Sequence, residues 1–223
     1  VDPRPDESVL DIGTGSGGLA LLAARRDAKV AGIDIAEEGI ERARARAKDN
    51  GLDIRFDVGD AQSLPYADAA FDVVVSTFGV IFAPDQRQAA RELARVCRAG
   101  GRLGLTLMPM DSRSGEATSI LREFGQGEGS DHPAAFADRL DELLGDTFEF
   151  EARRREVRAE PGATSWDDAL EQSGQLRTLA ATLPPEQLAD LRTRVEALLT
   201  KWASRPASYV IVVGRRRNTA TGD

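Results

Sequence analysis

The stretch Val9-Leu-Asp-Ile-Gly-Thr-Gly-Ser-Gly-Gly18 decides the fold of this 223-residue chain. An apolar strand pattern breaks here into a glycine turn, and a helical pattern over residues 19–26 follows at once. Glycine lets a backbone turn tightly and approach a ligand closely, and the start of a helix presents unpaired N–H groups. The stretch therefore predicts a strand–turn–helix unit that binds a nucleotide.

An acidic residue at the end of the next strand supports a nucleoside ligand. Asp34 ends the apolar run that begins at Lys29, and it follows Gly13 at the distance where a ribose-binding carboxylate is expected. The glycines alone leave the cofactor open, because Gly13, Gly15 and Gly18 also satisfy the G-x-G-x-x-G pattern of dinucleotide-binding proteins.

Four motifs in the same order resemble one enzyme family. Asp11 extends the glycine run to D-x-G-x-G-x-G, which resembles motif I of the class I S-adenosylmethionine-dependent methyltransferases. The other three are Gly59-Asp-Ala61 with Leu64-Pro65, the strand pattern over 71–76, and the segment 92–101. The resemblance covers residues 9 to about 108, and it is nearest to the ubiquinone/menaquinone-biosynthesis-like small-molecule methyltransferases.

The alternation of apolar and helical patterns predicts an α/β fold. With the resemblance, it implies a doubly wound, Rossmann-like seven-stranded sheet whose last strand is antiparallel, with a helical cover inserted after strands five and six. The expected strands are 8–12, 29–33, 54–58, 71–76, 102–108, 147–158 and 208–214. The expected helices are 17–26, 37–50, 86–98, about 133–144, one from Ser165 and one after Pro185, with Gly51 and Gly100 following two of them.

The region after residue 110 departs from the regular alternation. We expect a mobile loop with a short helix over 111–133, a bulge or irregular edge in strand six, and an antiparallel pair of helices in the later insertion. The predicted organisation is an S-adenosylmethionine-binding core, a substrate loop and cover with a helix, strand six, the helical cover insertion, strand seven and a tail, over residues 1–110, 111–146, 147–160, 161–205, 206–217 and 218–223 respectively.

The charge and composition of the chain bear on its binding partners and its cellular location. The net charge of −8 opposes binding to nucleic acid, and no apolar run approaches the roughly 20 residues of a membrane span. The single cysteine, Cys97, excludes an internal disulfide and is interpreted as a small core residue, so a cytoplasmic location is expected. Two arginine triplets, 153–155 and 215–217, are interpreted as exposed edge or tail charges, with a basic binding site as the alternative.

The resemblance implies S-adenosylmethionine as cofactor and assigns roles at the site. Asp34 is expected to accept hydrogen bonds from the ribose hydroxyls, Asp60 from the adenine amino group, and Asp11 from the amino group of the methionine moiety. Ala61 would offer its N–H to the adenine ring, beside an apolar wall of Ile35 or Leu64. The full predicted cofactor-binding set is Asp11, Gly13, Thr14, Gly15, Gly17, Asp34, Ile35, Asp60, Ala61, Gln62, Thr77 and Phe78.

The sequence assigns no catalytic residue and predicts no metal site. His132, the only histidine, is a candidate base, although a solvated loop histidine is the favoured interpretation; Asp85, Asp111 and Glu116 are further candidates. The leading hypothesis is in-line methyl transfer to a carbon, oxygen or nitrogen of a small-molecule acceptor. The alternatives are an NAD(P)-dependent oxidoreductase and a non-catalytic cofactor-binding protein; a homodimer is a further hypothesis for the assembly.

Overall fold

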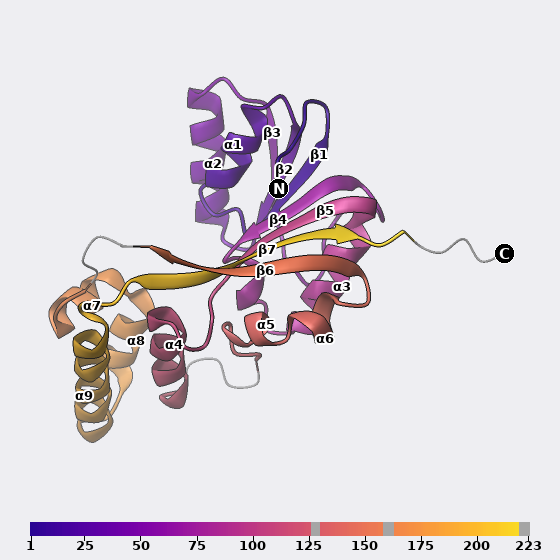
Figure 1. Cartoon of the computed structure of the whole chain (residues 1–223). Helices are drawn as coiled ribbons and strands as arrows, with labels where there is room; N and C mark the ends of the chain where they lie inside the picture. Colours follow the sequence, from indigo (N-terminus) through magenta and orange to yellow (C-terminus); the bar gives the residue numbers. More distant parts are fainter. Residues whose placement is uncertain (126–129, 158–162, 219–223) are drawn as a thin grey trace.

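The computed structural model describes residues 1–125, 130–157 and 163–218. Within them, one sheet has the strand order β3-β2-β1-β4-β5-β7-β6 (Figure 1). β7 runs antiparallel between β5 and β6, and the other pairs are parallel, which confirms the predicted fold class. The strands are β1 Ser8–Ile12, β2 Lys29–Asp34, β3 Ile54–Val58, β4 Phe71–Thr77, β5 Cys97–Leu107, β6 Phe148–Val157 and β7 Ala207–Arg216.

Helices pack on both faces of the sheet because its central strands are apolar on both sides. Val9 of β1 contributes to a core with α1 and α2, whereas the next residue, Leu10, contributes to the core on the opposite face, with α3, α5 and α6. This alternation is the period of two that strand geometry imposes. The helices are α1 Gly18–Ala24, α2 Glu37–Asp49, η1 Val80–Phe82, α3 Gln86–Val96, α4 Arg113–Glu123, α5 Ala135–Asp138, α6 Leu140–Leu144, α7 Trp166–Gln172, α8 Gly174–Thr182 and α9 Pro185–Trp202.

Four helices, α4, α7, α8 and α9, form a helical cover beside the sheet, at the lower left of Figure 1. They share their own apolar core, in which Trp166, Leu176 and Leu191 are buried. The helix expected within residues 111–133 is α4, which is 11 residues long and is capped by Ser112. One prediction is corrected here. The expected pair of helices is three, because Ser173 interrupts the first and its side chain accepts from Leu176 N at 3.2 Å.

Two local predictions, one about strand six and one about Gly100, are also wrong. β6 has no bulge within its described residues, because Phe148–Val157 pairs with β7 in one unbroken register. Its charged residues lie along the exposed edge of the sheet, where they need no irregular backbone. Gly100 does not end a helix: α3 stops at Val96, and Gly100 lies within the early start of β5 at φ +69°. The predicted boundary between strand six and the helical cover insertion, at residues 160 and 161, lies outside the described residues.

The turn after β1 touches the turn after β4. Gly13 has φ +67°, and a Cβ on it would lie 2.4 Å from the Cα of Gly79. A side chain at either glycine would therefore push the two turns apart. Because β1 pairs with β2 on one side and with β4 on the other, this contact lies at the point where the strand order reverses. Ligands of open α/β sheets bind outside the carboxyl ends of the strands at this point.

Two glycine substitutions separate the effect of this contact from that of backbone strain. Gly15 also has positive φ, +53°, but a Cβ on it would meet nothing within 4 Å. We expect Gly15→Ala to lower the free energy of unfolding by about 1 kcal/mol and Gly13→Ala by about 3 kcal/mol, since only the latter adds a clash. Urea denaturation followed by circular dichroism measures both. Equal losses would show that the Gly13–Gly79 contact does not constrain the fold.

Candidate functional site

A pocket of about 210 Å³ lies at the carboxyl ends of β1, β2 and β3. Five residues of the predicted cofactor-binding set line it, namely Gly13, Asp34, Ile35, Asp60 and Ala61. The glycine turn forms one side and two carboxyl groups from successive strand ends lie on another. The prediction thus brought together residues that are up to 48 positions apart in the chain, Gly13 and Ala61.

The Asp34 side chain is held by the backbone of two turns. Its Oδ2 accepts from Gly15 N at 2.7 Å, and its Oδ1 accepts from Ala36 N at 2.9 Å. Asp34 itself is half-buried, and each carboxylate oxygen has a further lone pair. The carboxylate is thereby fixed in orientation while keeping acceptor capacity for two neighbouring hydroxyls.

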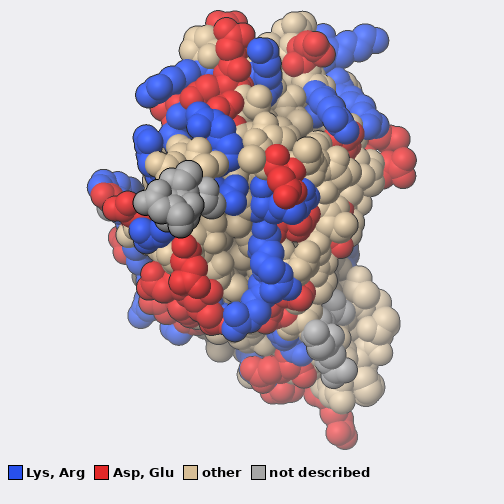
Figure 2. Space-filling view, turned by 90° about the vertical axis from the view of Figure 1, so that its right-hand side faces the viewer, with Lys and Arg blue, Asp and Glu red and all other residues tan. Residues whose placement is uncertain are grey.

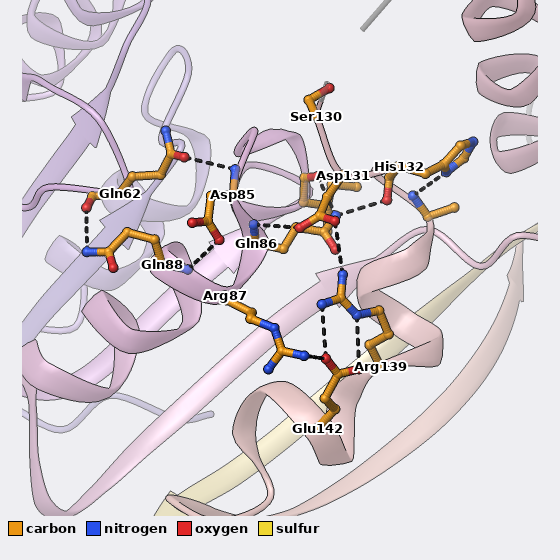
Figure 3. Close-up of polar contacts among 12 residues, drawn as sticks. Gln62, Asp85, Gln86, Arg87, Gln88, Ser130, Asp131, His132, Arg139 and Glu142 are labelled. Carbon is orange, nitrogen blue, oxygen red and sulfur yellow. Dashed lines mark hydrogen bonds and ion pairs between the residues drawn. The ribbon is translucent and has the colours of Figure 1, made fainter. Parts of the chain in front are cut away.

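Asp60 is oriented in a similar way by the next turn. Its Oδ1 accepts from Gln62 N at 2.8 Å, and the Gln62 side-chain amide donates to both Asp60 oxygens at 3.1 and 2.9 Å. Gln62 does not line the pocket; it acts on Asp60 and, through Oε1, accepts from Asp85 N at 2.9 Å (Figure 3). Gln62 therefore positions the carboxylate that faces the pocket.

Asp11 lies beneath the glycine turn and does not line the pocket. Its side chain is buried, and its Oδ2 accepts from Thr14 Oγ1 at 2.7 Å and from Ala20 N at 3.2 Å. Burial raises the pKa of Asp11 to about 6, against the lowering effect of these two hydrogen bonds. Asp11 and Thr14 together connect β1 to the first turn of α1. Gly17 is the N-cap residue of this helix. Contact of Asp11 with the cofactor stays a prediction.

The segment after β4 supplies pocket residues that the sequence did not indicate. Thr77 ends β4 and is exposed, whereas Phe78 has the unusual φ of +59° and packs edge-to-face on Tyr209 at 6.4 Å between ring centroids. Neither lines the pocket. The segment after β4 lines the pocket with Gly79, Phe82, Ala83 and Pro84, and the strand ends add Ile12, Ile33 and Gly59. A bulky non-glycine residue at positive φ is costly, and such strained residues cluster at functional sites. This signal is visible only in the structure.

His132 has both ring nitrogens engaged. Nδ1 accepts from Ala134 N at 3.1 Å, and Nε2 lies 3.1 Å from Ser119 Oγ on α4. Since Nδ1 accepts, the proton of the neutral ring is on Nε2, which donates to Ser119. Burial, with the nearby charge of Arg122, lowers the pKa of His132. The half-buried ring thus connects α4 to the segment before α5, which favours a structural role over that of a base.

The other candidate bases are engaged in contacts within the protein. Asp85 caps α3 by accepting from Gln88 N at 2.9 Å. Asp111 accepts two hydrogen bonds of 2.7 Å from Arg154, and Glu116 accepts from Lys201 at 2.7 and 2.8 Å. These cationic partners lower the pKa of Asp111 and of Glu116, which makes both weaker bases.

A polar network joins the pocket side of the molecule to the segment before α5 (Figure 3). Gln86, fully buried, donates from its backbone N to Asp131 Oδ2 and from Nε2 to His132 O, both at 2.9 Å. Arg139 donates to Asp131 Oδ1 at 3.1 Å, and Glu142 pairs with both Arg139 and Arg87. The end of the predicted mobile loop is therefore fixed to the start of α3.

The comparisons with known proteins agree with this geometry. Residues 9–101 match the family model described as a methyltransferase domain. Through this segment the chain is similar to methyltransferases. The match covers the strands that carry the glycine turn, Asp34 and Asp60, so the family and the pocket rest on the same residues. The ubiquinone-like subgroup stays a resemblance.

Relatives match a longer segment of the chain than the family model does. An uncharacterized protein of Mycobacterium bovis is 40% identical over 129 residues, which is 58% of this chain and 47% of that protein. The 27-O-demethylrifamycin SV methyltransferase of Amycolatopsis mediterranei is 40% identical over 130 residues, covering 56% of this chain and 48% of that enzyme. The chain thus spans about half the length of the curated relatives it matches.

A solved structure shares the whole fold. The YcgJ protein from Bacillus subtilis superimposes with a TM-score of 0.69 at 20% sequence identity, covering 98% of this chain and 95% of that one. At this identity the likeness concerns the fold, including the antiparallel last strand. No helix in the described part of the chain is long and apolar enough to cross a bilayer.

The raised pKa of Asp11 predicts a pH-dependent difference from Asp11→Asn. An aspartate that is protonated up to about pH 6 in the folded protein, but only to about 3.8 when unfolded, destabilises the fold as pH rises between these values. The free energy of unfolding of Asp11→Asn, relative to the original chain, should rise by up to about 3 kcal/mol over this interval. Denaturant titrations at several pH values measure the difference. A constant difference would mean that Asp11 titrates normally.

Proposed function

We propose that this protein transfers the methyl group of S-adenosylmethionine to a small-molecule acceptor. The observation that carries the proposal is the placement of two oriented carboxylates, Asp34 and Asp60, at the ends of β2 and β3 on one side of the glycine turn. Asp34 would accept from the ribose hydroxyls and Asp60 from the adenine amino group. When bound, the cofactor would supply a sulfonium-activated methyl group.

The pocket suits the nucleoside part of this cofactor. Its volume of about 210 Å³ is below the 300–1,000 Å³ of sites that enclose a whole ligand. The walls are apolar at Ile35 and Phe82, as a purine ring requires, and acidic at the rim, which suits hydroxyl and amino donors better than the phosphates of a dinucleotide. Asp11 lies below the turn and would act on the methionine end of the ligand through Thr14 or a water.

The acceptor would lie beyond the ends of β4 and β5. Phe78 and Met110, which are 38% and 37% exposed, follow these two strands and offer apolar contact. We infer that the chain aligns a partly apolar acceptor and excludes water there, which is the main task in an in-line displacement. The relative from Amycolatopsis is named as a methyltransferase of a rifamycin precursor, which is consistent with such an acceptor.

The binding partners and the cellular location are part of the same proposal. The net charge of −8 supports an acceptor that is not a nucleic acid, because phosphate backbones would be repelled. We further propose a cytoplasmic location, supported by the single buried cysteine, and homodimerisation as a hypothesis for size-exclusion chromatography to test.

Substitution of Asp34 tests the proposed ribose contact. Asp34→Asn keeps the size of the side chain but replaces one acceptor oxygen by a donor. We expect it to weaken binding of S-adenosylhomocysteine in isothermal calorimetry by about 1.5–3 kcal/mol, or roughly tenfold to 150-fold. Asp53→Ala, at an exposed position before the amino end of β3, serves as the control and should bind normally.

The same titration carried out with NAD and NADP separates this proposal from its alternative. Binding of a nicotinamide nucleotide without S-adenosylhomocysteine would contradict the proposed function and favour an oxidoreductase. Unchanged affinity of Asp34→Asn for S-adenosylhomocysteine would remove Asp34 from the site. Thermal unfolding of the variant shows whether a loss of affinity reflects a loss of fold.

A further inference from the structure

A cavity of about 420 Å³ lies at the opposite end of the sheet from the glycine turn. The segment before β1, the first half of β5, the start of β6 and the end of β7 form its walls. Two glutamates and six arginines line it; the arginines are Arg4, Arg98, Arg102, Arg215, Arg216 and Arg217. The triplet interpreted from the sequence as tail charges therefore belongs to a concave basic site.

Part of this arginine cluster is held in place by partners within the protein. Arg102 donates to both carboxylate oxygens of Glu7, at 3.0 and 2.6 Å, and these two side chains are only 20% and 14% exposed. Arg98 pairs with Asp72, and Arg216 donates to the Cys97 carbonyl. These contacts fix the floor of the cavity.

The other arginines of the cavity, Arg4, Arg215 and Arg217, have few partners within the protein. Among the described residues, the side chains of Arg4 and Arg215 form no hydrogen bond or ion pair, although the charge of Arg4 helps to lower the pKa of Glu7. Arg217 donates only to the Gly145 carbonyl at 3.4 Å. Arg215 lies directly opposite Arg102 across the β5–β7 pair, a position where like charges destabilise a sheet. On its other side Arg215 lies opposite Glu149, which forms no ion pair within the described part of the chain. Since Glu7 already pairs with Arg102, an anion at this position would chiefly compensate the charge of Arg215.

The basic site is limited to the cavity and its rim. Figure 2 shows the face of the molecule that includes the end of β7, where patches of Lys and Arg alternate with patches of Asp and Glu. The whole chain carries −8, so a long polyanion would meet acidic surface on either side. The cavity volume falls in the range of sites for small molecules. Arginine forks match the oxygens of phosphate in a bidentate manner.

We propose that this cavity binds the phosphate group of a small phosphorylated molecule, with Arg215, Arg4 and Arg217 as its ligands. The site is separate from the pocket at the carboxyl ends of the strands and does not depend on the proposed methyl transfer. Arg102 would support the phosphate site indirectly, because its bidentate pair with Glu7 holds β5, the strand that faces Arg215, against the segment before β1.

Isothermal calorimetry with pyrophosphate as the probe tests the site. The original chain should bind pyrophosphate, and Arg215→Gln should weaken that binding by about tenfold or more, since charge-assisted hydrogen bonds are lost. Arg155→Gln is the matched control: Arg155 is also an exposed arginine without a side-chain partner among the described residues, but it lies outside the cavity, toward the other end of β6. It should bind like the original chain.

Three results would overturn the proposal. These are no binding of pyrophosphate at millimolar concentration, equal losses in Arg215→Gln and Arg155→Gln, and binding to single-stranded RNA or to anionic phosphatidylglycerol vesicles without binding of pyrophosphate. The circular dichroism spectrum and thermal unfolding of Arg215→Gln should match those of the original chain. A lower unfolding temperature would show that the variant is misfolded, and the milder Arg217→Gln, which should weaken pyrophosphate binding, then replaces it.

Discussion

The contact between the turns after β1 and β4 is the constraint on which the rest of the site depends. Gly13 and Gly79 approach so closely that neither position has room for a side chain. This approach places the glycine turn against the wall formed by Phe82 and Pro84, and the pocket lies between them. The same turn supplies Gly15 N to the Asp34 carboxylate. One backbone contact thus sets both the shape of the pocket and the orientation of its acid.

Much of the central fold was predictable because its signals are local. Five consecutive parallel strands are short apolar runs between glycine, aspartate or helical patterns, and burial on both faces requires that composition. Asp34 and Asp60 were predictable because their places at strand ends follow from the motif order. Gly79, Phe82 and Pro84 were not, because they reach the pocket only through the packing of the β4 turn on the β1 turn.

The later part of the chain was harder to predict for a common reason. The helix expected within residues 111–133 is polar and has little periodicity of its own, and as α4 it is stabilised by packing against α9 and by its Ser112 cap. Ser173 ends one helix and caps the next, a break that apolar spacing through Leu170 and Leu176 does not reveal. Tertiary packing decides these elements, and a single sequence carries no direct record of it.

The hydrogen-bond network around Gln86 connects the pocket to the helical cover. Asp60 is held by Gln62, Gln62 accepts from the backbone of Asp85, and the adjacent Gln86 holds Asp131 and the carbonyl of His132. The His132 ring in turn contacts Ser119 on α4. A chain of hydrogen bonds therefore runs from the pocket to the helical cover, and it gives the cover a defined place relative to the proposed cofactor.

A crystal structure of the protein with S-adenosylhomocysteine would show whether the pocket binds adenosine. We expect the adenosine in the pocket between the glycine turn and the β4 turn, with both ribose hydroxyls on Asp34 and the adenine amino group on Asp60. Adenosine bound elsewhere, or bound in this pocket without contact to Asp34, would contradict this expectation.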